Sequence, residues 1–362
     1  MINTSIGYSF AKYSILFTAN QEYGFVRKIQ GTGKIILQIL QILAIIKMRS
    51  FYLFIFIMIL ENLYSYYFYR KHYKKKYNYI VKVIDRDKNI VKDMKNLFWH
   101  KIGTVVVHNT DFILLSKFVS LSIVGVYSSY LIVYQTLITL IGILTSVLTP
   151  KIGIFVVNHN KEEIYEYWNK LYSIYIFIAT IFIICTDILI EPFMNLWLGK
   201  DFFLSKLSIM FILVNLFIHL TRGVTDCFKT SCGFFDDTYT PGLESLLNFI
   251  FSFILVQKIG LNGVILGTVI SNIIIILLLK PILVFKRCFN KSGLIYIKDT
   301  LKLFTQSLIS MVIVKILSSK LSFMTQNIIS WKQFIIKTII IGAISLSVTC
   351  IIFILNKKEL TK

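Results

Sequence analysis

Residues 122–148 read SIVGVYSSYLIVYQTLITLIGILTSVL, an apolar stretch without a charged side chain. A helix needs about 20 predominantly apolar residues to cross the hydrocarbon core of a bilayer. About eleven stretches of this kind follow one another along the chain, separated by short polar connections. We therefore predict an all-α integral membrane protein with about eleven transmembrane helices.

The overall composition agrees with this prediction. Hydrophobic residues make up 56% of the 362 residues, and charged residues only 16%. Soluble domains are about 45–50% apolar, so much of the excess has to be covered by lipid. The predicted spans are residues 2–20, 33–47, 50–68, 100–117, 122–148, 168–189, 206–226, 243–257, 261–285, 302–319 and 333–356.

The basic residues alternate between rich and poor connections. About 27 of the Lys and Arg residues lie in connections on one side of the predicted spans, and about 10 on the other. The positive-inside rule makes the basic side cytoplasmic and places the C-terminus inside the cell. The same rule explains the formal net charge of +21, so we predict no nucleic-acid partner.

Ionisable groups inside predicted spans are costly, and each is therefore a functional hypothesis. The first cluster is His108, Asn109 and Asp111, in VVVHNTDFILLSKF. A buried carboxylate beside an imidazole could exchange a proton or hold Na⁺ through oxygen ligands. The alternative is a satisfied structural pair, with Lys117 reaching the membrane surface.

The second cluster lies on one face of the span that ends near residue 226. His219, Arg222 and Asp226 are three and four residues apart, and Lys229 follows at the predicted cytoplasmic mouth. Arg222 and Lys229 suit an anionic phosphate group, although positive-inside bias at a helix end explains them too. Glu244 and Asn248 open the next span, as cavity-lining residues or as a favourable helix N-terminal charge.

The chain lacks the motifs of common catalytic sites. We find no glycine-rich phosphate loop, no HExxH pair and no supported Ser/His/Asp arrangement, so we predict neither an enzyme nor a bound cofactor. Cys227 and Cys232 lack the companions that a zinc site needs, so we predict no metal site and read all five cysteines as free thiols.

Three segments together resemble the Wzx-type polysaccharide flippases of the MATE-like MOP exporter superfamily. They are NTDFILLSKFVSLSIVGVYSSY (109–130), NLWLGKDF (195–202) and YTPGLESLLNFIFSFILVQKIGLNGVILGTVIS (239–271). Each motif alone is loose, but their order and spacing are fairly specific. Residues 3–29, NTSIGYSFAKYSILFTANQEYGFVRKI, resemble the fourth span of that family, which suggests that three spans are missing upstream.

The resemblance implies a two-lobe helix bundle. Residues 1–69 would be the remainder of the N-lobe, and 70–99 a basic cytoplasmic linker that is partly amphipathic helix. Residues 100–285 would form the C-lobe, and 286–362 two extra spans and a cytoplasmic tail. Gly263 and Gly267, four residues apart in an apolar helix, also indicate a close helix-packing face on their own.

The resemblance also implies a function. Such a protein would flip an undecaprenyl-pyrophosphate-linked oligosaccharide across the bacterial cytoplasmic membrane, for capsule, O-antigen or exopolysaccharide synthesis. Expected partners are this lipid, membrane lipids, H⁺ or Na⁺, and a polysaccharide polymerase. A polar, cationic cavity between two lobes would replace the water lost by the headgroup.

Other functions stay open at this point. An envelope polysaccharide polymerase or ligase also has many spans, but such enzymes usually carry a long external loop with arginines. A drug or cation antiporter of the same superfamily differs only in its substrate. A truncated, inactive remnant of a flippase is the third alternative.

Overall fold

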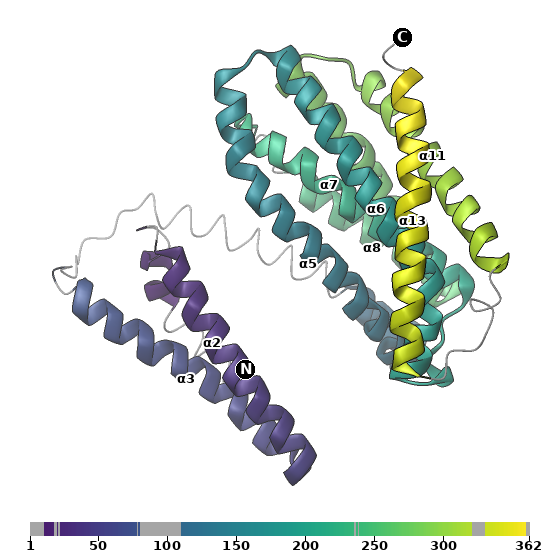
Figure 1. Cartoon of the computed structure of the whole chain (residues 1–362). Helices are drawn as coiled ribbons and strands as arrows, with labels where there is room; N and C mark the ends of the chain where they lie inside the picture. The colour runs from purple at the N-terminus through teal and green to yellow at the C-terminus, as the bar shows by residue number, and fades with distance from the viewer. Residues whose placement is uncertain are drawn as a thin grey trace. The chain divides into compact units, whose positions relative to one another are not determined.

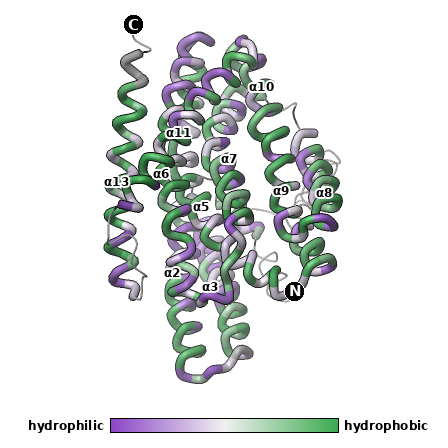
Figure 2. Tube along the Cα trace, turned by 90° about the vertical axis from the view of Figure 1, so that its right-hand side faces the viewer, coloured by the Kyte–Doolittle hydropathy of each residue, from purple (hydrophilic) through white to green (hydrophobic). Residues whose placement is uncertain are grey.

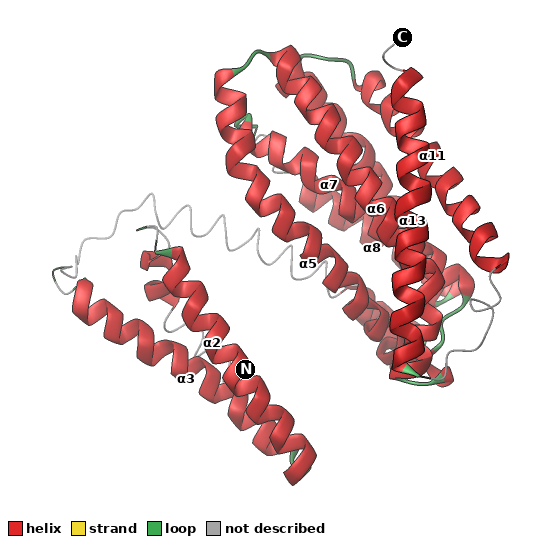
Figure 3. Ribbon diagram, in the orientation of Figure 1, coloured by secondary structure: helices red, strands yellow, loops and turns green. Residues whose placement is uncertain are grey.

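A computed structural model describes residues 11–17, 20, 22–77, 79, 110–234, 237, 239–320 and 330–359. Every regular element in these ranges is a helix (Figure 3). The α-helices, labelled in Figure 1 where there is room, are α2 (Tyr23–Leu43), α3 (Phe51–Lys76), α5 (Leu121–Asn158), α6 (Lys161–Trp197), α7 (Lys206–Ser231), α8 (Thr240–Ile259), α9 (Leu261–Asn272), α10 (Lys280–Val284), α11 (Gly293–Lys320) and α13 (Trp331–Glu359). Residues 110–118 are also helical. The π-helical turns Ala44–Met48, Ile273–Leu279 and Phe285–Phe289 continue α2, α9 and α10, and a 3₁₀ turn covers Lys200–Phe202.

Eight helical segments in the described ranges are long and apolar enough to cross a membrane. Hydrophobic residues run along most of the length of the helices (Figure 2). Large apolar side chains remain exposed there, as Ile46 is at 69% and Ile339 at 65%. An aqueous protein would not leave so much apolar surface open, so the exposed faces are suited to lipid.

Contacts within the chain divide it into two compact units, Met1–Lys92 and Asp93–Lys362. In the first unit α2 and α3 form an antiparallel hairpin, with a tight turn at Arg49 and Ser50. Arg49 has the left-handed backbone angle φ 45°, and the Ser50 hydroxyl accepts a hydrogen bond from the Leu53 backbone nitrogen at 3.3 Å. Gly33 lets the helices approach, because a Cβ there would lie 2.8 Å from the Tyr64 ring.

The open end of this hairpin is tied by one carboxylate. Glu22, just before α2, accepts hydrogen bonds from Lys76, from His72 at 2.7 Å and from Tyr77 at 2.9 Å. The hydrogen bond from Lys76 is the main cause that lowers the pKa of Glu22 from 4.5 to about 2. These hydrogen bonds stabilise the last turns of α3, which continues to Lys76, eight residues beyond the predicted span 50–68.

The second unit is built around α6, which packs against α7, α11 and α13. Its core is aromatic where α6 meets the chain around α10: the Trp168 ring lies 4.7 Å from Phe285 and 4.5 Å from Tyr172. Trp168 and Phe285 are completely buried. This packing fixes α6 and α7, and α7 in turn carries much of the candidate site.

Helices α8 and α9 form a second tight hairpin. Gly260, with φ 56°, makes the turn between them. A Cβ added to Gly267 would lie 2.5 Å from the backbone nitrogen of Ser252, and one added to Gly263 would overlap the backbone at Leu255. The close packing face expected at Gly263 and Gly267 is therefore present, and it is made by the preceding helix of the same chain.

Polar contacts join α6 to α11 at several levels along the two helices. The Tyr172 and Thr300 hydroxyls are 3.3 Å apart, those of Thr180 and Ser307 2.7 Å, and Lys315 pairs with Asp187 at 2.5 Å. The separations along the chain are nearly constant, so the two helices run parallel and in a single register.

Some predicted boundaries differ from the structure. The residues between the predicted spans 122–148 and 168–189 are almost all helical, and only His159 and Asn160 form the turn. Pro150 lies inside α5 without ending it. The stop comes instead from Asn160, whose side chain caps α6 in a reciprocal box with Glu163. The first predicted span and that at 100–117 are described only over residues 11–17 and from 110 onward, and the amphipathic half of the predicted linker lies outside the described residues.

Candidate functional site

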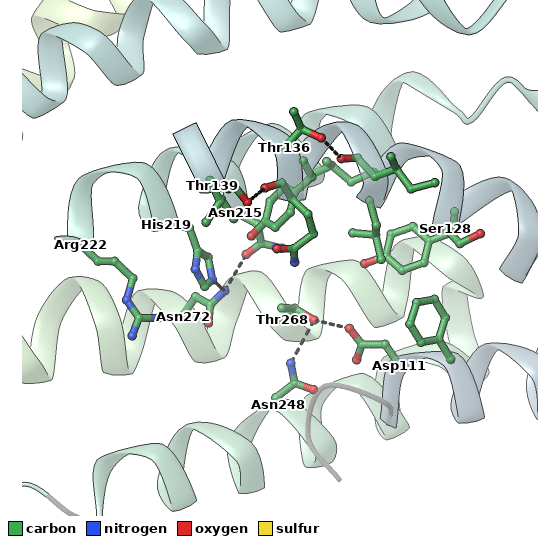
Figure 4. A pocket seen from close by; sticks show the side chains of 18 of the residues that line it. Asp111, Ser128, Thr136, Thr139, Asn215, His219, Arg222, Asn248, Thr268 and Asn272 are labelled. Atoms are coloured by element: carbon green, nitrogen blue, oxygen red, sulfur yellow. Dashed lines mark hydrogen bonds between the residues drawn. The ribbon is translucent and has the colours of Figure 1, made fainter. Parts of the chain in front are cut away.

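A cavity of about 1090 Å³ lies within the second unit (Figure 4). The helix 110–118 and helices α5, α7, α8 and α9 contribute its lining. Ionisable and amide side chains from all five of these helices face it: Asp111, Gln135, Asn215, His219, Arg222, Glu244, Asn248 and Asn272. A polar cavity inside a bundle of apolar helices is a place where a hydrophilic group can sit at membrane depth.

One end of the cavity is a cluster of oxygen atoms around Asp111. The Thr268 hydroxyl lies 3.3 Å from Asp111 Oδ2 and 3.1 Å from the Val264 carbonyl oxygen, and it accepts a hydrogen bond from Asn248 Nδ2 at 3.1 Å. The hydroxyl has one proton for two acceptors. Asp111 Oδ1 is buried and has no hydrogen-bond partner among the described residues. These oxygens are the kind of ligand that Na⁺ or a proton requires.

The packing of α8 on α9 builds this cluster. Because Gly267 and Gly263 carry no side chains, the two helix backbones come close enough for Asn248 to reach Thr268. Ser252 supports the same contact by donating to the Val264 carbonyl at 3.1 Å. The distance between α8 and α9 therefore controls the geometry around Asp111.

Amide groups occupy the middle of the cavity. Asn272 Nδ2 donates to Asn215 Oδ1 at 3.0 Å and lies 3.4 Å from His219 Nε2. Asn215 and Asn272 were not among the site residues expected from sequence, although each interrupts an apolar run. Thr268 was expected only as part of a family motif. Their pairing across α7 and α9 depends on tertiary packing, which the sequence pattern does not give.

Two ion pairs involve the lining residues Arg222 and Glu244. Arg222 Nε donates to Asp226 Oδ2 on the same helix at 3.0 Å, and Lys280 pairs with Glu244 at 3.6 Å. Figure 4 places Asp111 and Arg222 on opposite sides of the view. The described lining holds one guanidinium, two carboxylates and one imidazole. It is therefore not the strongly cationic lining that the sequence led us to expect.

Helix α5 supplies a hydroxyl-bearing face. Ser128, Thr136 and Thr139 line the cavity, and each hydroxyl donates to a backbone carbonyl one turn earlier, at 2.7–2.8 Å. Each hydroxyl proton is used within the helix, but each hydroxyl oxygen can still accept a hydrogen bond from a bound molecule.

The structure brings four of the seven predicted site residues to this cavity: Asp111, Arg222, Glu244 and Asn248. Lys229 lies elsewhere. It forms an ion pair with the buried Asp237, and its ammonium is 5.8 Å from the centre of the Phe234 ring, so it holds the segment after α7. His108 and Asn109 lie outside the described residues. No group of three His, Cys, Asp or Glu suited to a metal ion occurs within the described ranges.

Comparisons with known proteins give one informative result. No family model matches the chain, and no curated protein matches its sequence. Among solved structures, the fold is similar to the lipid II flippase MurJ in an inward closed conformation, with a TM-score of 0.65 and 20% identity. The match covers 97% of this chain and 71% of that one. The predicted fold class, an all-α bundle of membrane-spanning helices, is confirmed, and its fold is like that of this flippase.

Proposed function

We propose that this chain is a membrane transporter, not an enzyme, and that it flips a lipid-linked sugar precursor between the leaflets of the bacterial cytoplasmic membrane. The observation that carries the proposal is the cavity of about 1090 Å³, which holds polar and ionisable side chains among apolar ones and lies between helices whose outer faces suit lipid. The likeness in fold to a lipid II flippase supports it.

The physical problem that such a protein solves is desolvation. A sugar headgroup or a pyrophosphate loses its water in hydrocarbon, and each unpaired polar group costs several kcal/mol. The amides of Asn215 and Asn272 and the hydroxyls of α5 offer replacement hydrogen bonds, while a polyprenyl tail can remain in lipid. Alternating access to such a cavity would carry the headgroup across.

The finer substrate assignment also belongs to this proposal. The sequence motifs favour an undecaprenyl-pyrophosphate-linked oligosaccharide used for capsule, O-antigen or exopolysaccharide. Arg222 is the candidate that attracts the pyrophosphate, since its planar fork donates two hydrogen bonds to one oxyanion group. Lys229 serves this role less directly, because Asp237 already neutralises it.

The Asp111 cluster is the candidate site of energy coupling. A carboxylate and a hydroxyl meet there beside a main-chain carbonyl, the Asn248 amide nitrogen donates to the hydroxyl, and one carboxylate oxygen is unused by the described residues. Binding of Na⁺ or H⁺ would neutralise this buried charge and bias one conformation of the cavity.

One observation favours a second candidate, a cation or drug antiporter. In the described lining, Arg222 is paired with Asp226 and Glu244 with Lys280, so the lining charge left without an ion-pair partner there is the Asp111 carboxylate. Such a lining suits a cationic cargo better than an anionic one. The two candidates differ in the charge of the molecule that the cavity binds.

Depletion of the protein in its host would test the proposal. We expect lipid-linked sugar units to accumulate on the inner leaflet and surface polymer to decline. A complementing copy with Arg222→Gln should restore export poorly. A copy with Asp187→Asn should restore export fully, because Asp187 lies away from the cavity. Normal surface polymer together with increased sensitivity to cationic drugs would favour the antiporter instead.

A further inference from the structure

Arg222 is held by a carboxylate that does not itself line the cavity. Its Nε donates to Asp226 Oδ2 at 3.0 Å, one helical turn away on α7. The two side chains are 28% and 40% exposed, so neither is sealed in the protein interior. Asp226 has no part in the function derived so far.

The geometry of this pair leaves most of the guanidinium available. Arginine carries five N–H donors, and the single hydrogen bond to Asp226 uses the one on Nε. The two terminal nitrogens make no hydrogen bond with other described residues. Asp226 therefore fixes the plane of the guanidinium without occupying the fork that would grip a phosphate.

The charges around Arg222 balance one another. Asp226 offsets Arg222, and Lys280 offsets Glu244 at 3.6 Å. An anionic headgroup that reaches Arg222 meets a guanidinium whose charge is already compensated. The attraction is therefore weaker than that of a lone arginine at the same depth.

We propose that Asp226 is a built-in counter-anion that sets how tightly Arg222 holds an anionic headgroup, so that the headgroup can leave the cavity again. This inference rests on the proposed flippase function and adds a regulating residue to the same site. Asp226 has two effects of opposite sign: it orients the guanidinium, which favours binding, and it repels the bound anion, which favours release.

Substitution can separate these two effects. Asp226→Asn keeps an oxygen that accepts from Nε but removes the negative charge. Asp226→Glu keeps the charge. Asp187→Asn is a matched control, because it neutralises a carboxylate that pairs with Lys315 between α6 and α11, away from the cavity lining.

The experiment measures binding of undecaprenyl pyrophosphate and of uncharged undecaprenol to the purified full chain, by native mass spectrometry in detergent. For Asp226→Asn we expect about two- to fivefold tighter binding of the pyrophosphate lipid, the range expected for a partly exposed ion pair. Binding of undecaprenol should not change, and neither Asp226→Glu nor Asp187→Asn should tighten the binding of the pyrophosphate lipid. The effect should vanish when Arg222→Gln is combined with Asp226→Asn.

The outcomes distinguish this inference from the proposed function. If the unaltered chain prefers the pyrophosphate lipid and Asp226→Asn leaves that preference unchanged or weaker, the counter-anion role is wrong and the flippase proposal stands. If the unaltered chain does not prefer the pyrophosphate lipid to undecaprenol, both are overturned.

Discussion

At the scale of single residues, Asp111 has the most demanding environment in the described cavity. One of its carboxylate oxygens is near the Thr268 hydroxyl, and the other is buried without a partner among the described residues. A buried acceptor without a partner is costly, so a cation or a proton at this oxygen would lower the cost of burying Asp111. The role of Asp111 in ion coupling is still a prediction.

Asp111→Asn tests that role. The amide has nearly the same shape but no charge, so we expect transport to lose its dependence on the Na⁺ or H⁺ gradient and to fall at least tenfold. Asp187→Asn is the control, because it neutralises a carboxylate that pairs with Lys315 away from the cavity lining. Gradient-driven transport by Asp111→Asn at the normal rate would remove Asp111 from the coupling site, provided that equal amounts of protein reach the membrane.

Glu22 gives a prediction for pH. The hydrogen bond from Lys76 lowers its folded-state pKa to about 2, whereas an unfolded glutamate titrates near 4.5. Its stabilising effect is therefore complete above about pH 4.5 and is lost as the pH falls through this value toward 2. A spin-label distance between the open ends of α2 and α3 should broaden over this range. In Glu22→Gln the distance should already be broad at pH 7 and should change little with acid.

At the scale of elements, the glycines of the α8–α9 hairpin decide the geometry of the site. Gly267→Ala would force a Cβ against the Ser252 backbone, and such overpacking costs about 1–3 kcal/mol. We expect lower thermal stability in detergent and weaker ion-dependent transport, since Asn248 and Thr268 would separate. Gly142→Ala is the matched control: a Cβ there meets nothing within 4 Å, so stability should not fall. Equal behaviour of the two variants would contradict this account of the hairpin.

The register between α6 and α11 rests on buried hydroxyls. The Thr180 and Ser307 hydroxyls are 2.7 Å apart, and each can also donate to its own helix. Removing one therefore breaks the interhelical bond without leaving the other unsatisfied. In a double-mutant cycle of Thr180→Val and Ser307→Ala, we expect a coupling energy of about 0.6 kcal/mol, as for polar pairs between membrane helices. A coupling energy of zero would mean that apolar packing alone sets the register.

At the scale of the whole molecule, the sequence predicts the helices better than their partners. The apolar runs locate the described spans because lipid imposes a minimum length on each. The turn at His159 and Asn160 was missed, because Lys151 and Pro150 looked like the start of a loop although the helix continues through both. Arg222 was predicted from the cost of a charge near a span and Asn248 from its place at the start of the next one, and both line the cavity. The pairing of Asn215 with Asn272 could not be predicted from the sequence, because the two residues lie 57 positions apart on different helices.

The side of the membrane on which each loop lies also remains a prediction. Contacts do gather loops of one predicted side: Lys291, just before α11, bonds Glu162 near the α5–α6 turn, and Phe289 packs against Phe228 at 6.0 Å. At the other end, Trp331 lies 5.9 Å from Phe193. The two groups are therefore separated within the second unit, as alternating basic and less basic loops require.

The central claim is that the cavity carries a lipid-linked sugar headgroup across the bilayer. Its most direct test uses liposomes containing the purified chain and undecaprenyl-pyrophosphate-linked sugar labelled in both leaflets, with an impermeant reagent that destroys label only outside. With an ion gradient imposed, we predict that the protected fraction falls well below one half. Vesicles containing Arg222→Gln should stay near one half. Protection that stays near one half with the unaltered chain, correctly inserted and folded, would contradict the claim.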